Sequence, residues 1–279
     1  MHFPVSQLRF PLNVWMAFVN ADVTIIEYLS LKLNGKININ RGSGKMEDSD
    51  WGYWYLDGNA SASTSTLDIY SESDSNLMAA IIDFRLLYQL VQVNDFYLHA
   101  GGGFLYQRFE FDISNLNQWY PSHQQYSAYL SANYPTADYS AHDLVAGKVM
   151  TYRVTYYIPY IQIAADFDVS SILRLSGSME LSPYVMARDV DDHILRSKEG
   201  KGESTGSMAA FKFAAKQKLT PDIFLCVSLN YMLIKTEGTQ VQSYYAPNSD
   251  GKPVGYYGTI DNELESRQIS FGFSAGYSF

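Results

Sequence analysis

The chain has little cysteine, little charge and no long apolar run. Cys226 is the only cysteine in 279 residues, so no disulfide can form within the chain. No apolar run reaches the roughly 18 residues of a membrane-spanning helix. The N-terminus lacks the basic region, apolar segment and cleavage site of a signal peptide. Charged residues make up only 18% of the chain, and its net charge of −9 argues against a nucleic-acid partner.

Aromatic residues, in contrast, are abundant. They make up 15% of the chain, and 23 of them are tyrosine. The mean hydropathy is close to neutral. Many aromatics, few charges and neutral hydropathy suit a membrane β-barrel whose outer face meets lipid and whose inner face is polar.

Alternation with a period of two dominates the sequence and predicts β-strands, because successive side chains of a strand point to opposite faces. In residues 29–40, leucine and isoleucine alternate with polar residues that include Lys32 and Lys36. A lysine facing the middle of a bilayer costs roughly 2–4 kcal/mol, so we assign the lysine face to the lumen. The last strand has an apolar face of Ile269, Phe271, Phe273, Ala275, Tyr277 and Phe279.

The alternating segments predict an all-β fold, an antiparallel transmembrane β-barrel that forms a single domain over residues 1–279. About nine strands are expected, at residues 5–18, 22–40, 65–91, 94–112, 147–168, 171–190, 205–219, 222–243 and 263–279. Short turns are expected near 20–22, 93–95, 168–170 and 220–222. Long polar loops are expected at about 41–64, 113–146, 191–204 and 244–262. Strict alternation of long and short connections is typical of outer-membrane barrels, with long loops outside and short turns in the periplasm.

The odd strand number leads to a further expectation. Bacterial barrels have an even number of strands, and an unpaired strand edge is not tolerated in lipid. We therefore expect a ten-stranded barrel whose first strand and signal peptide are missing from this sequence. Either the start is misassigned or trimmed, or the gene is truncated.

Two acidic clusters fall at the long-loop end, at residues 46–51 (MEDSDW) and 189–193 (DVDDH). Asp191 lies two residues before His193, on the same face of a continuing strand, and would orient its imidazole. Asp48 and Asp50 share a face in the same way, and two carboxylates that close should hold one proton between them. Taken singly, each cluster also fits a solvated loop, because aspartate is common in turns.

The chemistry expected of these groups is hydrolysis by activated water. Water held between Asp48 and His193 would attack a peptide carbonyl, and Asp50 would stabilise the oxyanion. The sequence offers no evident serine–histidine nucleophile arrangement and no His-Glu-x-x-His motif. We therefore expect neither a metal nor another cofactor.

The chain resembles the omptin family of outer-membrane proteases over nearly its whole length. The matching segments are residues 5–8 (VSQL), 46–51 (MEDSDW), 158–161 (IPYI), 189–193 (DVDDH) and the closing strand. The resemblance implies an endopeptidase that often cleaves next to basic residues, with lipopolysaccharide as an activating ligand. It implies catalytic roles for Asp48, Asp50, Asp191 and His193.

The resemblance also implies two binding sites. Asp189 matches a residue that lines the pocket for a basic side chain, and the other carboxylate of that pocket lies on the first strand, which we expect to be missing from this sequence. Arg108 matches a lipid A-binding arginine. The second such arginine aligns with Thr155, and Arg153 lies on the same face two residues away.

We therefore expect a monomeric outer-membrane endopeptidase with its active site outside the cell. Its partners would be surface polypeptides, membrane lipid and lipopolysaccharide. One alternative is a catalytically inactive barrel that acts as an adhesin or host-protein receptor. A second is a pore, although a ten-stranded barrel is too narrow for an aqueous channel once side chains fill it.

Overall fold

A computed structural model describes residues 6–51, 67–120, 143–247 and 253–278. Within these residues, eleven strands form one antiparallel sheet, which confirms the all-β prediction. The strands are β1 (Ser6–Arg9), β2 (Met16–Ile26), β3 (Leu29–Asn38), β4 (Gly42–Trp51), β5 (Leu67–Val93), β6 (Phe96–Trp119), β7 (Asp143–Ser170), β8 (Leu173–His193), β9 (Lys198–Lys218), β10 (Ile223–Tyr244) and β11 (Gly255–Tyr277). Among the described residues, no helix is long and apolar enough to cross a membrane.

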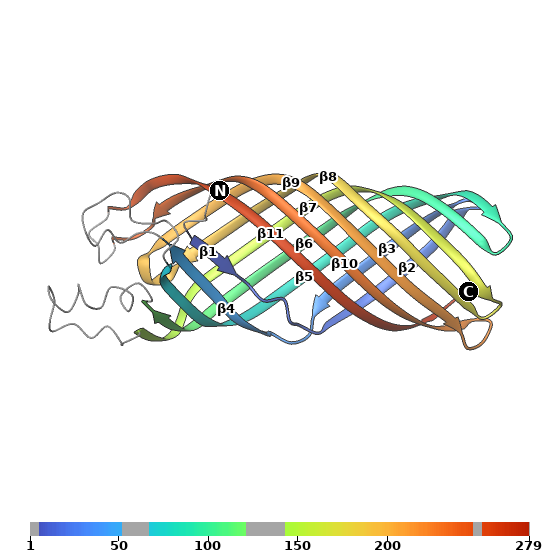
Figure 1. The fold of residues 1–279 in the computed structure, drawn as a ribbon, viewed down its shortest axis with the longest axis horizontal. Coiled ribbons are helices and arrows are strands. Elements are labelled where there is room, and N and C mark those ends of the chain that lie inside the picture. The colour runs from blue at the N-terminus through green and yellow to red at the C-terminus, as the bar shows by residue number, and fades with distance from the viewer. Residues whose placement is uncertain (1–5, 52–66, 121–142, 248–252, 279) are drawn as a thin grey trace.

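The strands run obliquely along an elongated body (Figure 1). From β5 to β11, each strand pairs with the next one along the chain. Both β3 and β4 pair with β5. β4 pairs with its N-terminal part and β3 with a later part, so the two strands follow one another along the same side of β5. β1 pairs with β4, and β2 pairs with β3. In the described part of the chain, β11 pairs only with β10, so hydrogen bonding does not close the sheet.

The expected N-terminal strands need correction. The turn expected at residues 20–22 is wrong, because β2 runs through it and the chain turns at residues 27–28. Asn20 and Asp22 are instead held across the β2–β3 pair: Asp22 lies 3.0 Å from Lys32 Nζ, and Asn20 accepts a hydrogen bond from Asn34. The structure has eleven strands instead of about nine, because an interruption at 10–15 divides the first expected strand and β4 lies within the loop expected at 41–64.

The strands also extend further towards the long-loop end than expected. The loop expected at residues 191–204 is wrong, since β8 continues to His193 and β9 begins at Lys198. β4 occupies much of the loop expected at 41–64, and β11 begins at Gly255 instead of near 263. Beyond the membrane both strand faces meet water or polar groups, so the alternation that identifies a strand fades. The rest of the expected long loops, at 52–66, 121–142 and 248–252, lies outside the described residues.

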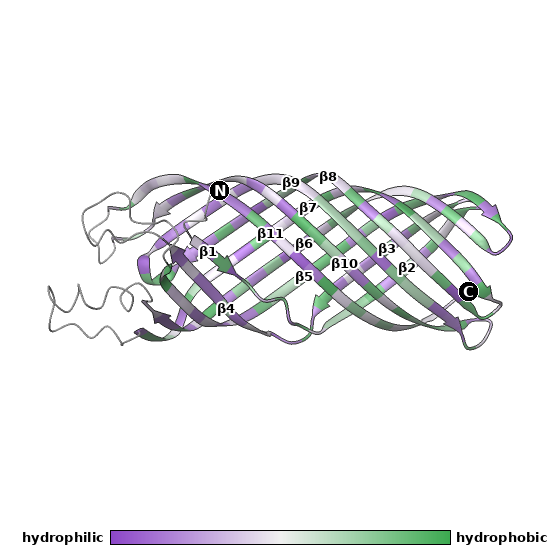
Figure 2. Ribbon diagram, viewed as in Figure 1, coloured by the Kyte–Doolittle hydropathy of each residue, from purple (hydrophilic) through white to green (hydrophobic). Residues whose placement is uncertain are grey.

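The outer face carries a belt of exposed apolar side chains, which we call the apolar band. Figure 2 shows the alternation of hydrophobic and hydrophilic residues along these strands. The band ends at Met78 in β5 and at Tyr184 in β8, and both strands continue beyond it. Its members include Ile82, Phe84, Leu86, Ile161, Ile163, Leu175, Met179, Leu181, Phe211, Phe213, Leu229, Ile269, Phe271 and Phe273. Such a band matches the hydrocarbon layer of a membrane.

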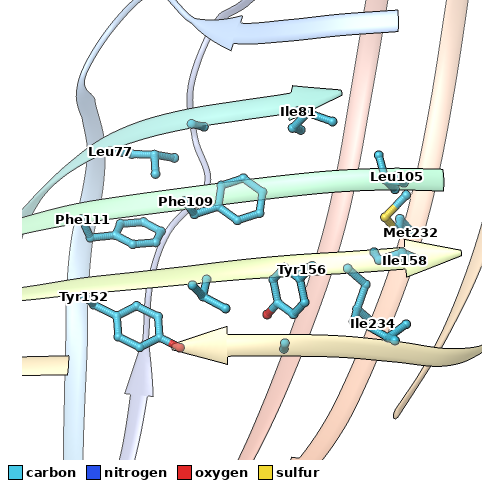
Figure 3. Close-up of a cluster of buried hydrophobic side chains, with 14 of the residues drawn as sticks. Leu77, Ile81, Leu105, Phe109, Phe111, Tyr152, Tyr156, Ile158, Met232 and Ile234 are labelled. Carbon is cyan, nitrogen blue, oxygen red and sulfur yellow. The ribbon is translucent and has the colours of Figure 1, made fainter. Parts of the chain in front are cut away.

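Inside the sheet, the middle layer is apolar, whereas the sequence suggested a polar lumen throughout. Figure 3 shows this layer, to which β5, β6, β7 and β10 contribute side chains. Phe10, from the segment between β1 and β2, stacks on Tyr152 with ring centroids 4.4 Å apart and lies 4.9 Å from Phe111. The N-terminal segment therefore helps to fill the lumen and to anchor β1 beside β4.

The layer nearer the short turns is charged. Lys212 Nζ lies 2.5 Å from Glu180 and 3.5 Å from Asp83. Arg85 lies 3.3 Å from Asp83 and 3.6 Å from Glu180, and the Tyr160 hydroxyl donates to Asp83 at 2.5 Å. These side chains join β5 to β7, β8 and β9 across the lumen. We call this group the lumen charge cluster.

Candidate active site

The four residues expected to be catalytic lie on two strands beyond the apolar band. Asp48 and Asp50 are on β4, and Asp191 and His193 are on β8. In the sheet, β5, β6 and β7 separate β4 from β8, so the two pairs occupy different walls at the same end. All four line one open cavity of about 3210 Å³. The structure thus brings the two acidic clusters to one space.

Asp191 and His193 form a hydrogen-bonded pair. His193 Nε2 lies 3.0 Å from Asp191 Oδ2, and the Asp191 side chain is only 8% exposed whereas that of His193 is 25% exposed. The strand ends directly after His193 in a short 3-10 turn, in which Ser197 takes φ 50° and donates its backbone N–H to Ile194 at 3.2 Å. The imidazole thus lies at the very end of β8, and it lines the cavity together with its carboxylate partner.

Asp48 is the strongly perturbed group of the site. It lies opposite Leu8 of β1 and Ser71 of β5 in the sheet register, and its Oδ1 is buried without a hydrogen-bond partner among the described residues. Burial, and to a smaller extent the nearby Asp50 carboxylate, raises the pKa of the Asp48 carboxyl to about 7 against the opposing effects of His193 and Arg196. A carboxyl with this pKa is protonated in about half of the molecules at neutral pH.

Two cationic side chains near His193, those of Arg196 and Lys198, also line the cavity. Lys198 lies directly opposite His193 across the β8–β9 pair. Burial lowers the pKa of Lys198, and Asp191 and Asp50 partly offset this effect. Sequence reasoning treated both residues as part of a solvated loop. The alternation of Lys198, Gly200 and Gly202 with charged residues was the signal that β9 continues.

Asp189, the residue expected in a pocket for basic side chains, is 2% exposed and lines the same cavity. It accepts hydrogen bonds from Gln240 Nε2 and Asn262 Nδ2, both at 3.0 Å. Burial raises the pKa of the Asp189 carboxyl, and the hydrogen bond from Gln240 opposes that rise. Sequence reasoning missed both amide partners, because strand spacing alone does not reveal contacts between β8, β10 and β11.

Arg108 and Arg153 lie on the outer face of neighbouring strands, where the register pairs Arg108 with Thr155 and Glu110 with Arg153. Arg108 already donates to Glu110, through its Nε at 2.6 Å and through its Nη2. Arg153 has no ion-pair partner among the described residues. The two arginines are therefore neighbours on the outer face, and of the two only Arg108 has an ion-pair partner among the described residues.

No group of three or more histidine, cysteine, aspartate or glutamate side chains in the described part of the chain is arranged to hold a metal ion. The lone thiol, Cys226, is partly buried in β10 and is free.

The fold and the site together define an outer-membrane-type β-barrel with a paired aspartate and an aspartate–histidine pair at one end. The family model described as "Omptin family" matches residues 2–274. The chain therefore belongs to the omptin family, and the expected location in the outer membrane, with this end outside, follows from that membership.

Two individual proteins extend the comparison. The chain is 25% identical over 206 residues to the plasminogen activator of Yersinia pestis; the match covers 73% of this chain but only 59% of that protein. The chain thus matches less than two thirds of the length of this relative. The crystal structure of the outer membrane protease OmpT from Escherichia coli superposes with a TM-score of 0.75 at 16% identity, covering 98% of this chain and 87% of that one. This likeness confirms the expected outer-membrane barrel fold.

Proposed function

We propose that the chain is an outer-membrane endopeptidase that hydrolyses peptide bonds with a water molecule activated by His193 and the Asp48–Asp50 pair. The observation that carries this proposal is the 3.0 Å contact between Asp191 and His193, in a cavity also lined by a carboxyl whose pKa is about 7. A base held by a carboxylate and a nearby proton donor are the two groups that water attack on a carbonyl requires.

The roles follow from the environments of the groups. Asp191 fixes the imidazole of His193 and stabilises its charged form when His193 accepts a proton from the water. Asp48 and Asp50 share one proton, and the raised pKa of Asp48 makes this carboxyl its holder. Protonated Asp48 then donates a hydrogen bond to the developing oxyanion, a role that the sequence suggested for Asp50. Asp50 keeps its charge and helps to hold the water.

Three further parts of the proposal concern ligands and assembly. Asp189 favours a basic side chain next to the cleaved bond, by Coulomb attraction in a partly dry site. Arg153, assisted by Arg108, contacts lipopolysaccharide phosphate on the outer face. The barrel works as a monomer on polypeptides at the cell surface.

The test is cleavage of defined peptides by the purified chain, refolded in detergent with and without lipopolysaccharide. Mass spectrometry of the products should show hydrolysis next to arginine or lysine. Serine-protease inhibitors and chelators should leave the rate unchanged. Loss of activity with a chelator and its return with zinc would refute the mechanism, and a folded chain that cleaves no peptide would favour an inactive adhesin or receptor.

A further inference from the structure

The Asp189 pocket is built from the four neighbouring strands β8 to β11, three of which contribute polar side chains. Asp189 comes from β8, Gln240 from β10 and Asn262 from β11. One carboxylate oxygen accepts from Gln240 and the other from Asn262, each at 3.0 Å. Gln242 then donates to the side-chain oxygen of Gln240 at 3.1 Å, which fixes the orientation of that amide.

The strand between these partners, β9, makes room for them with two glycines. Gly202 lies opposite Asp189 in the β8–β9 register. Gly200 lies opposite Asp191 in the same register and opposite Gln242 in the β9–β10 register. A Cβ on Gly202 would stand 2.1 Å from Asp189 Oδ1, and one on Gly200 would stand 2.5 Å from Gln240 Oε1. Side chains of β8, β10 and β11 can meet above β9 only because both positions lack a side chain.

Within the part of the chain that the structure describes, the Asp189 carboxylate has no cation paired with it. Among the described residues, no lysine or arginine lies within ion-pair distance of Asp189, whereas Asp83 of the lumen charge cluster is held by Arg85 and Lys212. Amide donors orient a carboxylate without cancelling its charge. A buried carboxylate of this kind gains strongly from an incoming cation, because the partly dry surroundings strengthen the attraction.

We propose that Gln240 and Asn262 are positioning residues that hold Asp189 in place for one cationic side chain of the substrate. This inference rests on the proposed peptidase function and assigns the specificity of that same site. Gly200 and Gly202 provide the space for the amides, and Gln242 locks Gln240. The chain thus forms a basic-residue pocket around one carboxylate and two amides.

The experiment compares two fluorogenic peptides that differ only next to the cleaved bond, one with arginine and the other with citrulline, its neutral counterpart of similar shape. The enzymes are the full chain, Gln240→Ala, Asn262→Ala and the milder Asn262→Ser. Asn230→Ala is the matched control, because Asn230 is also a β10 amide that faces the lumen and donates to Ser270 at 3.2 Å. Correct folding of each variant is checked by its heat-dependent mobility in detergent gels.

Each pocket variant should raise KM for the arginine peptide about tenfold, the size expected for losing a hydrogen bond to a charged group, while kcat stays within about twofold. KM for the citrulline peptide should not change. A variant that slows both peptides equally has only a structural role, and variants that behave like Asn230→Ala overturn the inference. If the wild-type chain cleaves neither these nor any other peptide, the proposed function fails and this inference with it.

Discussion

The described residues include two aspartate–histidine pairs, and their comparison shows what makes one of them a candidate for catalysis. Asp191 and His193 lie 3.0 Å apart beyond the apolar band. His99 Nε2 and Asp166 Oδ2 lie 3.2 Å apart, between β6 and β7, near the short-turn end. The two contacts are nearly equal in length, so the contact alone cannot define the site.

The surroundings of the two pairs differ. Asp48, on the other wall of the cavity, is near enough to His193 to interact with it electrostatically, and its pKa is raised to about 7. In the other pair, Asp166 instead accepts a hydrogen bond from the Ser176 hydroxyl. A histidine with a positioned carboxylate needs a second acid–base group and space for substrate before it can activate water. Both pairs line the same cavity, but among the described residues only the pair beyond the apolar band has a carboxyl with a pKa near 7 close to it.

The buried carboxylates also form two groups, those paired with a cation and those without one. Asp83 and Glu180 in the lumen charge cluster are neutralised by Arg85 and Lys212. Asp189 has amide donors and Asp48 has an unpaired oxygen. Paired charges hold the walls together, whereas the unpaired ones remain available to a substrate or to water.

The largest effect should come from breaking the lumen charge cluster. Lys212→Met leaves Glu180, which is fully buried, without its closest cation, and removal of one partner of a buried pair costs about 3–5 kcal/mol of stability. The midpoint of denaturant unfolding, followed by gel mobility, measures this loss. Lys201→Met, which removes an exposed pair with Glu199, is the control and should cost below about 1 kcal/mol. Equal losses in the two variants would show that the cluster does not brace the barrel.

The next effect concerns the acid of the site. Asp48→Ala should lower peptide hydrolysis by about 10² or more, because it removes a group that stabilises the oxyanion. Asp48→Asn keeps an N–H donor and should lose less. Wild-type activity should fall as the pH rises above 7, where Asp48 loses its proton, and the asparagine variant should lack this fall. Identical pH profiles would contradict the assignment of the shared proton to Asp48.

A smaller effect concerns stability. The folded pKa of Asp48, about 7, lies above its ordinary value of 3.8. The folded state therefore binds more protons between these values, and the free energy of unfolding falls as the pH rises from about 4 to 7. Asp48→Asn removes this penalty and should stabilise the chain by about 1–3 kcal/mol at pH 8 but hardly at pH 4. A gain that is the same at both pH values would show that ionisation of Asp48 is not the cause.

The smallest effect is expected on the outer face. Arg153→Ala should weaken lipopolysaccharide binding about threefold to tenfold, as loss of one charge-assisted contact does. Arg108→Ala should have less effect, since Glu110 already holds that guanidinium. Titration of the detergent-solubilised barrel with lipopolysaccharide measures both. A larger loss in Arg108→Ala would reverse the assignment.

The sequence predicted the fold well where strands cross the membrane. Lipid on one face and polar or small groups on the other keep the alternation clear in β3, β8, β10 and β11. Prediction failed where strands leave the membrane, as at Lys198–Gly202, because charged residues and glycines there resemble a loop. It also failed at residues 20–22, where turn-type residues are held by partners in β3.

For the site, local spacing identified Asp48 with Asp50 and Asp191 with His193. Each pair needs only the two-residue repeat of one strand to share a face. The amide partners of Asp189 could not be found in this way. Gln240 and Asn262 lie 51 and 73 residues along the chain from Asp189, and their contact depends on the sheet register and on the two glycines of β9.

The most direct test of the account compares the two histidines in one assay. His193→Ala and His99→Ala each remove an imidazole from an aspartate pair, so the chemical change is the same. With both variants shown to be folded, the rate of peptide hydrolysis should fall by about 10² or more in His193→Ala, as loss of a general base requires, and should stay within about twofold in His99→Ala. Comparable rates in the two variants, or full activity without His193, would contradict the proposal that the aspartate–histidine pair beyond the apolar band activates water.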